Sequence, residues 1–143
     1  MKHALQLLHP LTVRFHEVDS YQIVWHGHYV GYFEEGREAF GRHYGLDYHR
    51  LEAEGYLGPI IEVSLDYRKS LRYGDQILVE TTFVETSAPK LIFTYRLLRA
   101  DTRELVCKGR TVQVLLDKEY RALQYAPPPF LMAWKQRWTP ASS

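Results

Sequence analysis

One long helical pattern dominates the chain, and its glycines limit what the helix can pack against. Aromatic residues recur at helical spacing over residues 29–44, charged residues separate them, and Gly45 is a natural end for the helix. Gly31, Gly36 and Gly41 lie inside this pattern. Each interior glycine costs a helix about 1 kcal/mol relative to alanine. We therefore expect the helix to pack closely against another element, such as a sheet.

Alternating apolar and polar residues indicate strands in most of the remaining chain. The expected strands cover residues 11–16, 61–68, 77–85, 91–99 and 104–117. In the first of them, Leu11, Val13 and Phe15 share one face, whereas residues 1–9 show no clear pattern. Asp47 is expected to cap a short second helix, a loop follows over residues 55–59, and a last short helix is expected over residues 130–138.

The order of these elements predicts the fold class. One strand, one long helix and four further strands indicate an α+β domain in which a single antiparallel sheet wraps the helix. Cys107, Gly109 and Thr111 share one face of the last strand and are small enough to let the helix lie close. With 143 residues, we expect a single domain over residues 1–143. A lone sheet leaves edges exposed, so a second copy of the chain is the expected partner.

Composition excludes several classes of function. The chain has 18 Lys+Arg against 17 Asp+Glu, so no overall charge draws it to nucleic acid or to a membrane surface. No stretch approaches the roughly 20 apolar residues of a membrane span. The single cysteine, Cys107, cannot form an internal disulfide, which suits a reducing compartment. We expect a soluble cytoplasmic protein with no nucleic-acid partner and no stable membrane insertion. The 11 Tyr, 6 Phe and 3 Trp indicate bulky packing and an extensive subunit contact.

Residues 13–29 hold the candidate chemistry. Asp19 is expected just past the first strand and ahead of a helix whose first N–H groups carry a partial positive charge. A carboxylate near such donors suits acyl transfer or hydrolysis, because the carboxylate attacks or activates water while the N–H groups stabilise an oxyanion. Aspartate also caps turns and helices very often, and the residues alone favour that second role.

The histidines of the same stretch raise the alternative of a metal site. His26 and His28 are separated by one residue, with His16 and Asp19 as candidate further ligands. Their spacing fits none of the common zinc patterns, so we expect no metal and solvated or hydrogen-bonded histidines. The sequence also lacks a nucleophilic serine motif and a glycine-rich phosphate loop.

Two motifs resemble a known family. Residues 17–29 read E-V-D-S-Y-Q-I-V-W-H-G-H-Y, and residues 66–75 read D-Y-R-K-S-L-R-Y-G-D. They are similar to the signatures D-x-D-x-x-G-[IV]-V-[YW]-[HY]-x-N-Y and D-Y-x-x-P-x-x-x-G-D of the hotdog-fold acyl-CoA thioesterases of the 4-hydroxybenzoyl-CoA thioesterase type. Together with the order of elements, the resemblance covers about residues 11–117.

The resemblance implies roles for individual residues. Asp19 falls on the family's catalytic aspartate, a nucleophile or a general base for water, and the His26 N–H falls where the thioester carbonyl is polarised. The implied substrate-binding residues are Tyr21, Gln22, Trp25, His28, Tyr29 and, from a partner subunit, Gly58, Pro59 and Ile60. Lys90 falls near residues that bind the nucleotide of coenzyme A, with Arg68 and Lys69 as weaker candidates. The family assembles as homodimers or homotetramers.

The departures from the family pattern concern substrate choice. Gln22 replaces the family's glycine and follows the bulky Tyr21, so we expect both to reshape the acyl pocket. His28 stands where asparagine is usual and is expected to place a second titratable group beside Asp19. Glu17 is a conservative replacement at the first acidic position, and Ser70 replaces a proline.

The resulting hypothesis is hydrolysis of an acyl-CoA thioester to a free acid and coenzyme A. It requires no metal and no cofactor, since coenzyme A is part of the substrate. Two alternatives stay open. The acyl group is carried by acyl carrier protein instead of coenzyme A, or the chain binds acyl-CoA without turning it over.

Overall fold

The computed structural model describes residues 5–138. Its elements are, in chain order, β1 (Gln6–Thr12), the 3-10 turn η1 (Phe15–Glu17), α1 (His28–Tyr44), α2 (Tyr48–Ala53), β2 (Tyr56–Leu57), β3 (Ile60–Tyr67), β4 (Gln76–Val84), β5 (Lys90–Arg99), β6 (Leu105–Val114), β7 (Leu116–Asp117) and α3 (Pro129–Trp138). No helix among these residues is long and apolar enough to cross a membrane.

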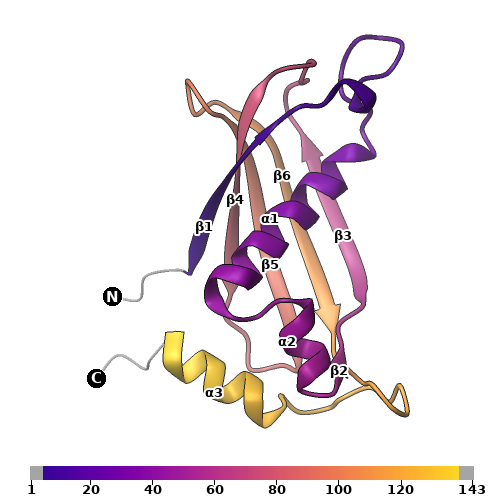
Figure 1. Cartoon of the computed structure of the whole chain (residues 1–143), viewed down its shortest axis with the longest axis vertical. Coiled ribbons are helices and arrows are strands. Elements are labelled where there is room, and N and C mark those ends of the chain that lie inside the picture. The colour runs from indigo at the N-terminus through magenta and orange to yellow at the C-terminus, as the bar shows by residue number, and fades with distance from the viewer. Residues whose placement is uncertain (1–4, 139–143) are drawn as a thin grey trace.

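A five-stranded antiparallel sheet forms the body of the protein. Its strand order is β1-β4-β5-β6-β3, so β1 and β3 are the edge strands, and β2 pairs separately with β7. Helix α1 lies diagonally across one face of this sheet, while α2 and α3 lie near one end of it (Figure 1). This arrangement confirms the predicted α+β class and the hotdog fold, a single sheet wrapped around one long helix.

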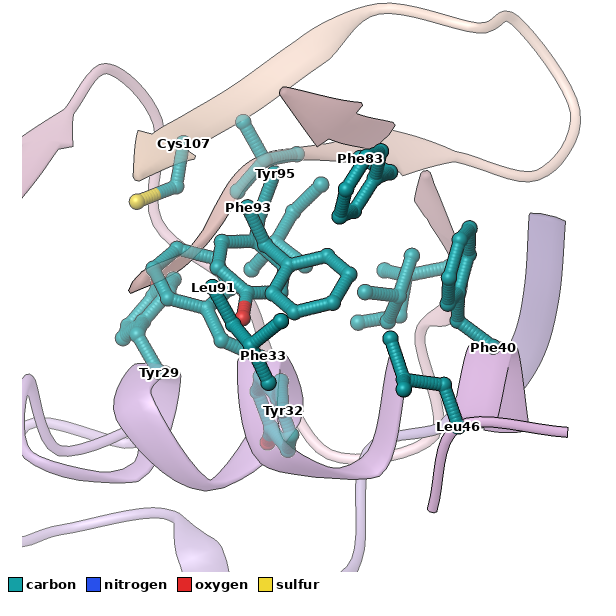
Figure 2. Close-up of a cluster of buried hydrophobic side chains, with 14 of the residues drawn as sticks. Tyr29, Tyr32, Phe33, Phe40, Leu46, Phe83, Leu91, Phe93, Tyr95 and Cys107 are labelled. Atoms are coloured by element: carbon teal, nitrogen blue, oxygen red, sulfur yellow. The ribbon is translucent and has the colours of Figure 1, made fainter. Parts of the chain in front are cut away.

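Aromatic side chains of α1 fill the space between the helix and the sheet (Figure 2). Tyr32, Phe33 and Phe40 are completely buried. The ring of Phe33 stacks on that of Tyr95 of β5, with centroids 4.6 Å apart. Burying aromatic side chains of this size is the main contribution to the stability of such a core. The predicted core face of α1 is therefore confirmed.

Two of the three helix glycines explain how closely α1 approaches its neighbours. A Cβ at Gly36 would overlap side chains of β4, and one at Gly41 would meet the backbone at the start of α2. Gly31 faces open space, so the prediction of close packing is wrong there. On the sheet, a Cβ at Gly109 would overlap the ring of Phe33, which confirms the expectation for the small residues of β6. The helix ends as predicted at Gly45, which has a φ of 76°.

The first strand differs from its prediction. It spans Gln6–Thr12 rather than residues 11–16, and Phe15 is 73% exposed. Beyond Thr12, the Arg14 N–H donates to the Glu17 carboxylate over 2.7 Å and the chain turns into η1. The prediction erred because the strand is defined by its pairing with β4, from Gln6 opposite Thr82 onward, which no local pattern reveals.

Smaller differences occur on either side of the sheet. The expected loop over residues 55–59 contains the two residues of β2. The expected strand over residues 104–117 is interrupted at the buried Leu115, which separates β6 from β7. The remaining strands and the two short helices agree with the predicted boundaries to within about two residues.

Candidate active site

Asp19 begins a tight loop that closes on itself. The Asp19 N–H donates to the Ile23 carbonyl and the Gln22 N–H donates to the Asp19 carbonyl, both over 2.9 Å. Just outside this turn, Val18 and Val24 form an isolated β-bridge. The side chain of Val24 is buried and its N–H donates to the Leu71 carbonyl over 2.8 Å. The base of the loop is thus fixed, and its tip projects from the protein.

The carboxylate of Asp19 has one oxygen engaged and one free. Its Oδ1 accepts the Tyr21 N–H over 2.8 Å, so Asp19 does cap a turn, the role that its residue type favours. Within residues 5–138, Oδ2 has no hydrogen-bond or ion-pair partner. Asp19 lines a cavity of about 660 Å³. The other lining residues are Phe15, His16, Val18, Ser20, Gln22, Arg72 and Tyr73. The turn therefore holds the carboxylate at an open cavity with one oxygen available for chemistry.

Gln22 adopts a backbone conformation that favours glycine. Its φ is 66°, in the left-handed region that residues with a Cβ rarely occupy. This conformation gives a physical reason for a glycine in the family signature at this position. The Gln22 side chain lines the Asp19 cavity, whereas Tyr21 is 83% exposed and does not. In one chain, only Gln22 of this pair is placed to shape the space around Asp19.

The start of α1 supplies the candidate N–H donors. The helix begins at His28 with Gly27 as its N-cap, so His26 lies two residues ahead of the first turn instead of within it. The His28 N–H donates to the Trp25 carbonyl over 2.9 Å. The N–H groups of His26 and Gly27 have no acceptor within the described part of the chain. Trp25 covers this turn, because a Cβ at Gly27 would overlap its ring.

A second, smaller cavity opens beside His26. It has a volume of about 270 Å³ and is lined by Ile23, Val24, His26, Tyr29, Tyr67, Arg68, Lys69 and Ser70. The Tyr67 hydroxyl donates to the His26 carbonyl over 2.9 Å, and the rings of Tyr67 and Tyr29 meet edge to face at 5.1 Å. Burial raises the pKa of Tyr29 to about 12, so its phenol stays neutral at physiological pH. Asp19 and His26 therefore line separate cavities in one chain.

The histidines do not gather into a metal centre. The ring of His28 lies 6.4 Å from that of His16 and 5.5 Å from that of Trp25, as measured between centroids. Among residues 5–138, no three His, Cys, Asp or Glu side chains are grouped closely enough to bind a metal ion. The structure thus places His28 in an aromatic cluster beside the loop.

The remaining predicted site residues lie at the other end of the sheet. Gly58 and Pro59 precede β3, where their carbonyls accept hydrogen bonds from Gln113 and Val114 of β6. Lys90 is paired with Val114 at the same end. Tyr67, at the opposite end of β3, is seven residues from Ile60, which separates the two ends by roughly 23 Å. One chain therefore brings Arg68 and Lys69 to His26 but leaves Gly58, Pro59, Ile60 and Lys90 far away.

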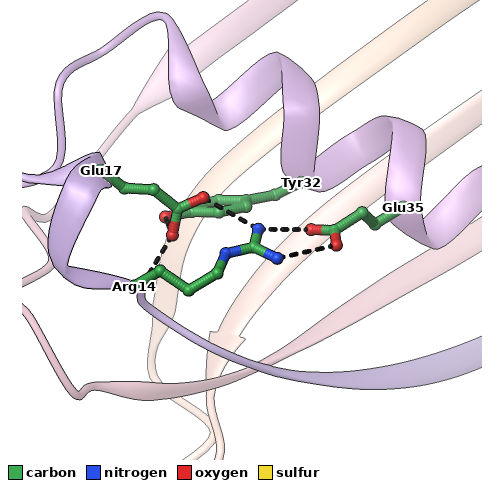
Figure 3. A network of polar contacts seen from close by, with 4 residues as sticks. All are labelled: Arg14, Glu17, Tyr32 and Glu35. Carbon is green, nitrogen blue, oxygen red and sulfur yellow. Dashed lines mark hydrogen bonds and ion pairs between the residues drawn. The ribbon is translucent and has the colours of Figure 1, made fainter.

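Sequence reasoning missed a buried charge network under the loop. Glu17 is 4% exposed, and its carboxylate binds Arg14 and Tyr32 (Figure 3). The signal that could have found it was Glu17 itself, an acidic residue two positions before Asp19, at the point where the alternating strand pattern stops. Nothing in the periodicity of α1 marks Tyr32 as its partner, because a tyrosine hydroxyl at a core position has no distinct pattern.

Comparisons with known proteins identify the family of the chain. The sequence model of the thioesterase-like superfamily matches residues 13–135, which include the Asp19 loop, α1 and the strands β3 to β6. YneP of Bacillus subtilis (strain 168), provisionally named an acyl-CoA thioesterase, is 29% identical over 116 residues, which are 80% of this chain and 83% of that protein. The acyl-acyl carrier protein thioesterase ATL3 of Arabidopsis thaliana is 26% identical over 114 residues, which are 80% of this chain and 60% of that protein.

A solved structure shows the same fold at similar sequence identity. TT1821 from Thermus thermophilus, described as a hypothetical protein, superposes with a TM-score of 0.80 and 30% identity, covering 93% of this chain and 97% of that chain. The family match extends over most of the sequence and contains both the Asp19 loop and the helix start. The chain belongs to the thioesterase-like superfamily.

Proposed function

We propose that the protein hydrolyses acyl-CoA thioesters to free acids and coenzyme A. The observation that carries this proposal is the free Asp19 Oδ2, held at an open cavity on a loop that leads into the unpaired His26 and Gly27 N–H groups. Membership of the thioesterase-like superfamily and the name of YneP support the reaction and the substrate class. No cofactor is required, because a carboxylate, N–H donors and water suffice for this hydrolysis.

The proposed chemistry uses Asp19 in one of two ways. As a nucleophile, its carboxylate attacks the thioester carbon, coenzyme A leaves as a thiolate that takes up a proton, and water cleaves the resulting anhydride. As a general base, the carboxylate takes a proton from water, which attacks the same carbon directly; the C–S bond then breaks, and the coenzyme A thiolate takes up that proton. In both cases the His26 and Gly27 N–H groups donate to the carbonyl oxygen as it gains charge. The thioester then lies across the loop between the two cavities.

Free thiol release from a panel of thioesters tests the function. The purified protein is assayed with acyl-CoAs of short, long and aromatic acyl groups, and with matched acyl carrier protein thioesters. We expect turnover with at least one acyl-CoA, at a kcat/KM above that of the matched carrier-protein thioester. Faster hydrolysis of the carrier-protein thioester would move the assignment to the activity of ATL3. Tight acyl-CoA binding without turnover would instead identify a binding module.

We also propose a homodimer formed through β3, which would bring the distant site residues to His26. Along this edge strand, Ile61, Val63 and Tyr67 are 51%, 42% and 46% exposed and lie on the face that α1 covers elsewhere. Antiparallel pairing of two β3 strands would cover this apolar row and satisfy the free backbone edge. It would also bring the Ile60 end of one chain to the Tyr67 end of the other. The partner's Gly58 and the partner's Lys90 would then approach His26.

The oligomeric state of a charged edge variant tests this arrangement. Val63→Lys places a cation in the centre of the proposed interface and is expected to yield a monomer with little turnover. Light scattering after size exclusion measures the mass, and circular dichroism checks the fold. Ser64→Lys, on the opposite face of the same strand, makes the same change in net charge, serves as the control and is expected to stay dimeric. A monomeric wild-type protein with full activity would contradict the proposal.

A further inference from the structure

Both oxygens of the buried Glu17 carboxylate accept hydrogen bonds. Its Oε1 accepts the Arg14 N–H over 2.7 Å and the Tyr32 hydroxyl over 3.0 Å, and its Oε2 accepts the Arg14 Nη2 over 2.8 Å. The guanidinium of Arg14 also binds both carboxylate oxygens of Glu35, over 3.2 and 3.0 Å (Figure 3). A carboxylate buried at 4% exposure is retained in a fold only when its oxygens are paired in this way.

This network keeps Glu17 ionised. Burial by itself raises the pKa of Glu17, but the hydrogen bonds from Arg14 and Tyr32 outweigh it, and the pKa is lowered from its ordinary value. Glu17 is therefore a fixed negative charge at neutral pH. Glu17 lines neither of the two cavities described above.

Glu17 connects the two halves of the proposed site. Its side chain reaches Tyr32, one helical turn after His28, and so ties the residue to the start of α1. Its carbonyl accepts the Trp25 N–H over 2.9 Å, directly before His26. Along the chain it precedes Asp19 by two residues. The separation between the Asp19 carboxylate and the His26 and Gly27 N–H groups thus depends on contacts that converge on Glu17.

We propose that Glu17 is a positioning residue for the reaction, which holds the Asp19 loop at the correct distance from the N–H groups ahead of α1. This role rests on the proposed function and goes beyond it by assigning the network a kinetic consequence. Glu17 touches no substrate atom. Its removal acts through the placement of Asp19, where a displacement of about 1 Å can cost on the order of 100-fold in rate.

Three conservative variants test the role. Glu17→Gln keeps the carbonyl that accepts from Tyr32 but turns an amide group toward the Arg14 guanidinium. Tyr32→Phe removes one hydroxyl from the same carboxylate. Glu35→Gln is the matched control, because it weakens a contact of Arg14 without touching Glu17. We expect kcat to fall about 10- to 100-fold in Glu17→Gln and about 3- to 10-fold in Tyr32→Phe, with KM within about 3-fold, and to stay within about 2-fold in Glu35→Gln.

Two further readouts separate positioning from loss of fold and from direct proton transfer. Turnover is measured well below the melting temperature, and the rate is divided by the concentration of folded protein. The pH profile of kcat is expected to keep its shape in Glu17→Gln, and amide hydrogen exchange over residues 18–25 is expected to become faster. A Glu17→Gln protein with wild-type kcat overturns the proposal. A loss of kcat that matches the unfolded fraction also overturns the proposal. A shift of the acidic limb of the pH profile of kcat in Glu17→Gln overturns it as well.

The exchange measurement also distinguishes this proposal from the proposed function. If the wild-type protein hydrolyses no thioester in the panel, the assignment of the reaction fails. Exchange over residues 18–25 then still tests whether Glu17 holds the loop. Faster exchange in Glu17→Gln than in Glu35→Gln would support the positioning role, and unchanged exchange would overturn it.

Discussion

The base and the tip of one loop carry two carboxylates with opposite surroundings. Glu17, at the base, is 4% exposed and accepts three hydrogen bonds from Arg14 and Tyr32. Asp19, two residues on, is half-buried, accepts one backbone hydrogen bond and keeps one oxygen free at a large cavity. The same functional group thus serves stability where both of its oxygens accept hydrogen bonds, and is available for chemistry where one oxygen is free.

The comparison also separates rigid from strained backbone. At the base, Val18 and Val24 pair across the loop, and the Trp25 N–H is bound to Glu17. At the tip, Gln22 occupies a left-handed conformation. A strained residue next to a candidate catalytic group persists only when the surrounding structure holds it in place. The well-bonded base is therefore what makes the unusual tip sustainable.

The largest expected difference between base and tip is in stability. Glu17→Ala leaves Arg14 and Tyr32 without their buried partner and should lower the free energy of unfolding by about 2–3 kcal/mol. Asp19→Ala loses one exposed turn contact and should cost about 0.5–1 kcal/mol. Urea denaturation followed by circular dichroism measures both values. Equal destabilisation by the two substitutions would remove the distinction between base and tip.

Low pH should reduce the contribution that Glu17, at the base of the loop, makes to stability. Its folded pKa lies below the ordinary value of 4.5, so its contribution to stability is complete above about pH 4.5 and is lost as the pH falls through the folded pKa. The melting temperature of the wild-type protein should therefore decline between about pH 5 and 3 more steeply than that of Glu17→Gln. Thermal scans at several pH values provide the measurement. Parallel curves for the two proteins would show that Glu17 is not the group responsible.

The smallest expected effect concerns the strain at the tip. Gln22→Gly removes the Cβ that disfavours a φ of 66°, and should raise the free energy of unfolding by about 0.5 kcal/mol despite the added freedom of the unfolded chain. Ser20→Gly is the matched control, because Ser20 lies in the same exposed turn without a positive φ. That change should lower stability slightly. A destabilising Gln22→Gly would mean that the Gln22 side chain makes contacts that outweigh the strain.

Local patterns predicted the parts of the molecule that local interactions determine. The helix from residue 28 to Gly45 follows from aromatic spacing and a glycine that accepts a left-handed conformation, and Asp47 caps α2 through the Arg50 N–H as its residue type suggests. The start of β1 escaped prediction because it depends on pairing with β4 about 70 residues away. The exposed Phe15 was assigned to a strand face for the same reason, since only the Glu17 cap shows where the strand stops.

For the candidate site, the sequence indicated residues but not the geometry that the structure gives them. The motif around Asp19 identified the loop, but the left-handed conformation of Gln22 was not predicted from the sequence. Sequence could not show that Asp19 and His26 line different cavities, because that depends on how Trp25 and Tyr67 pack over the turn. It also could not link Glu17 to Tyr32, whose side chains meet only because α1 lies against the loop.

Turnover and stability of Asp19→Asn, measured on the same sample, test the division between base and tip most directly. Asparagine keeps a side-chain oxygen for the Tyr21 N–H but can neither attack a thioester as a carboxylate nor accept a proton from water. We predict a melting temperature within about 3 °C of wild type and a kcat reduced by at least about 1000-fold on any acyl-CoA that the wild-type protein hydrolyses. Full activity in a folded Asp19→Asn protein would contradict the assignment of the chemistry to Asp19.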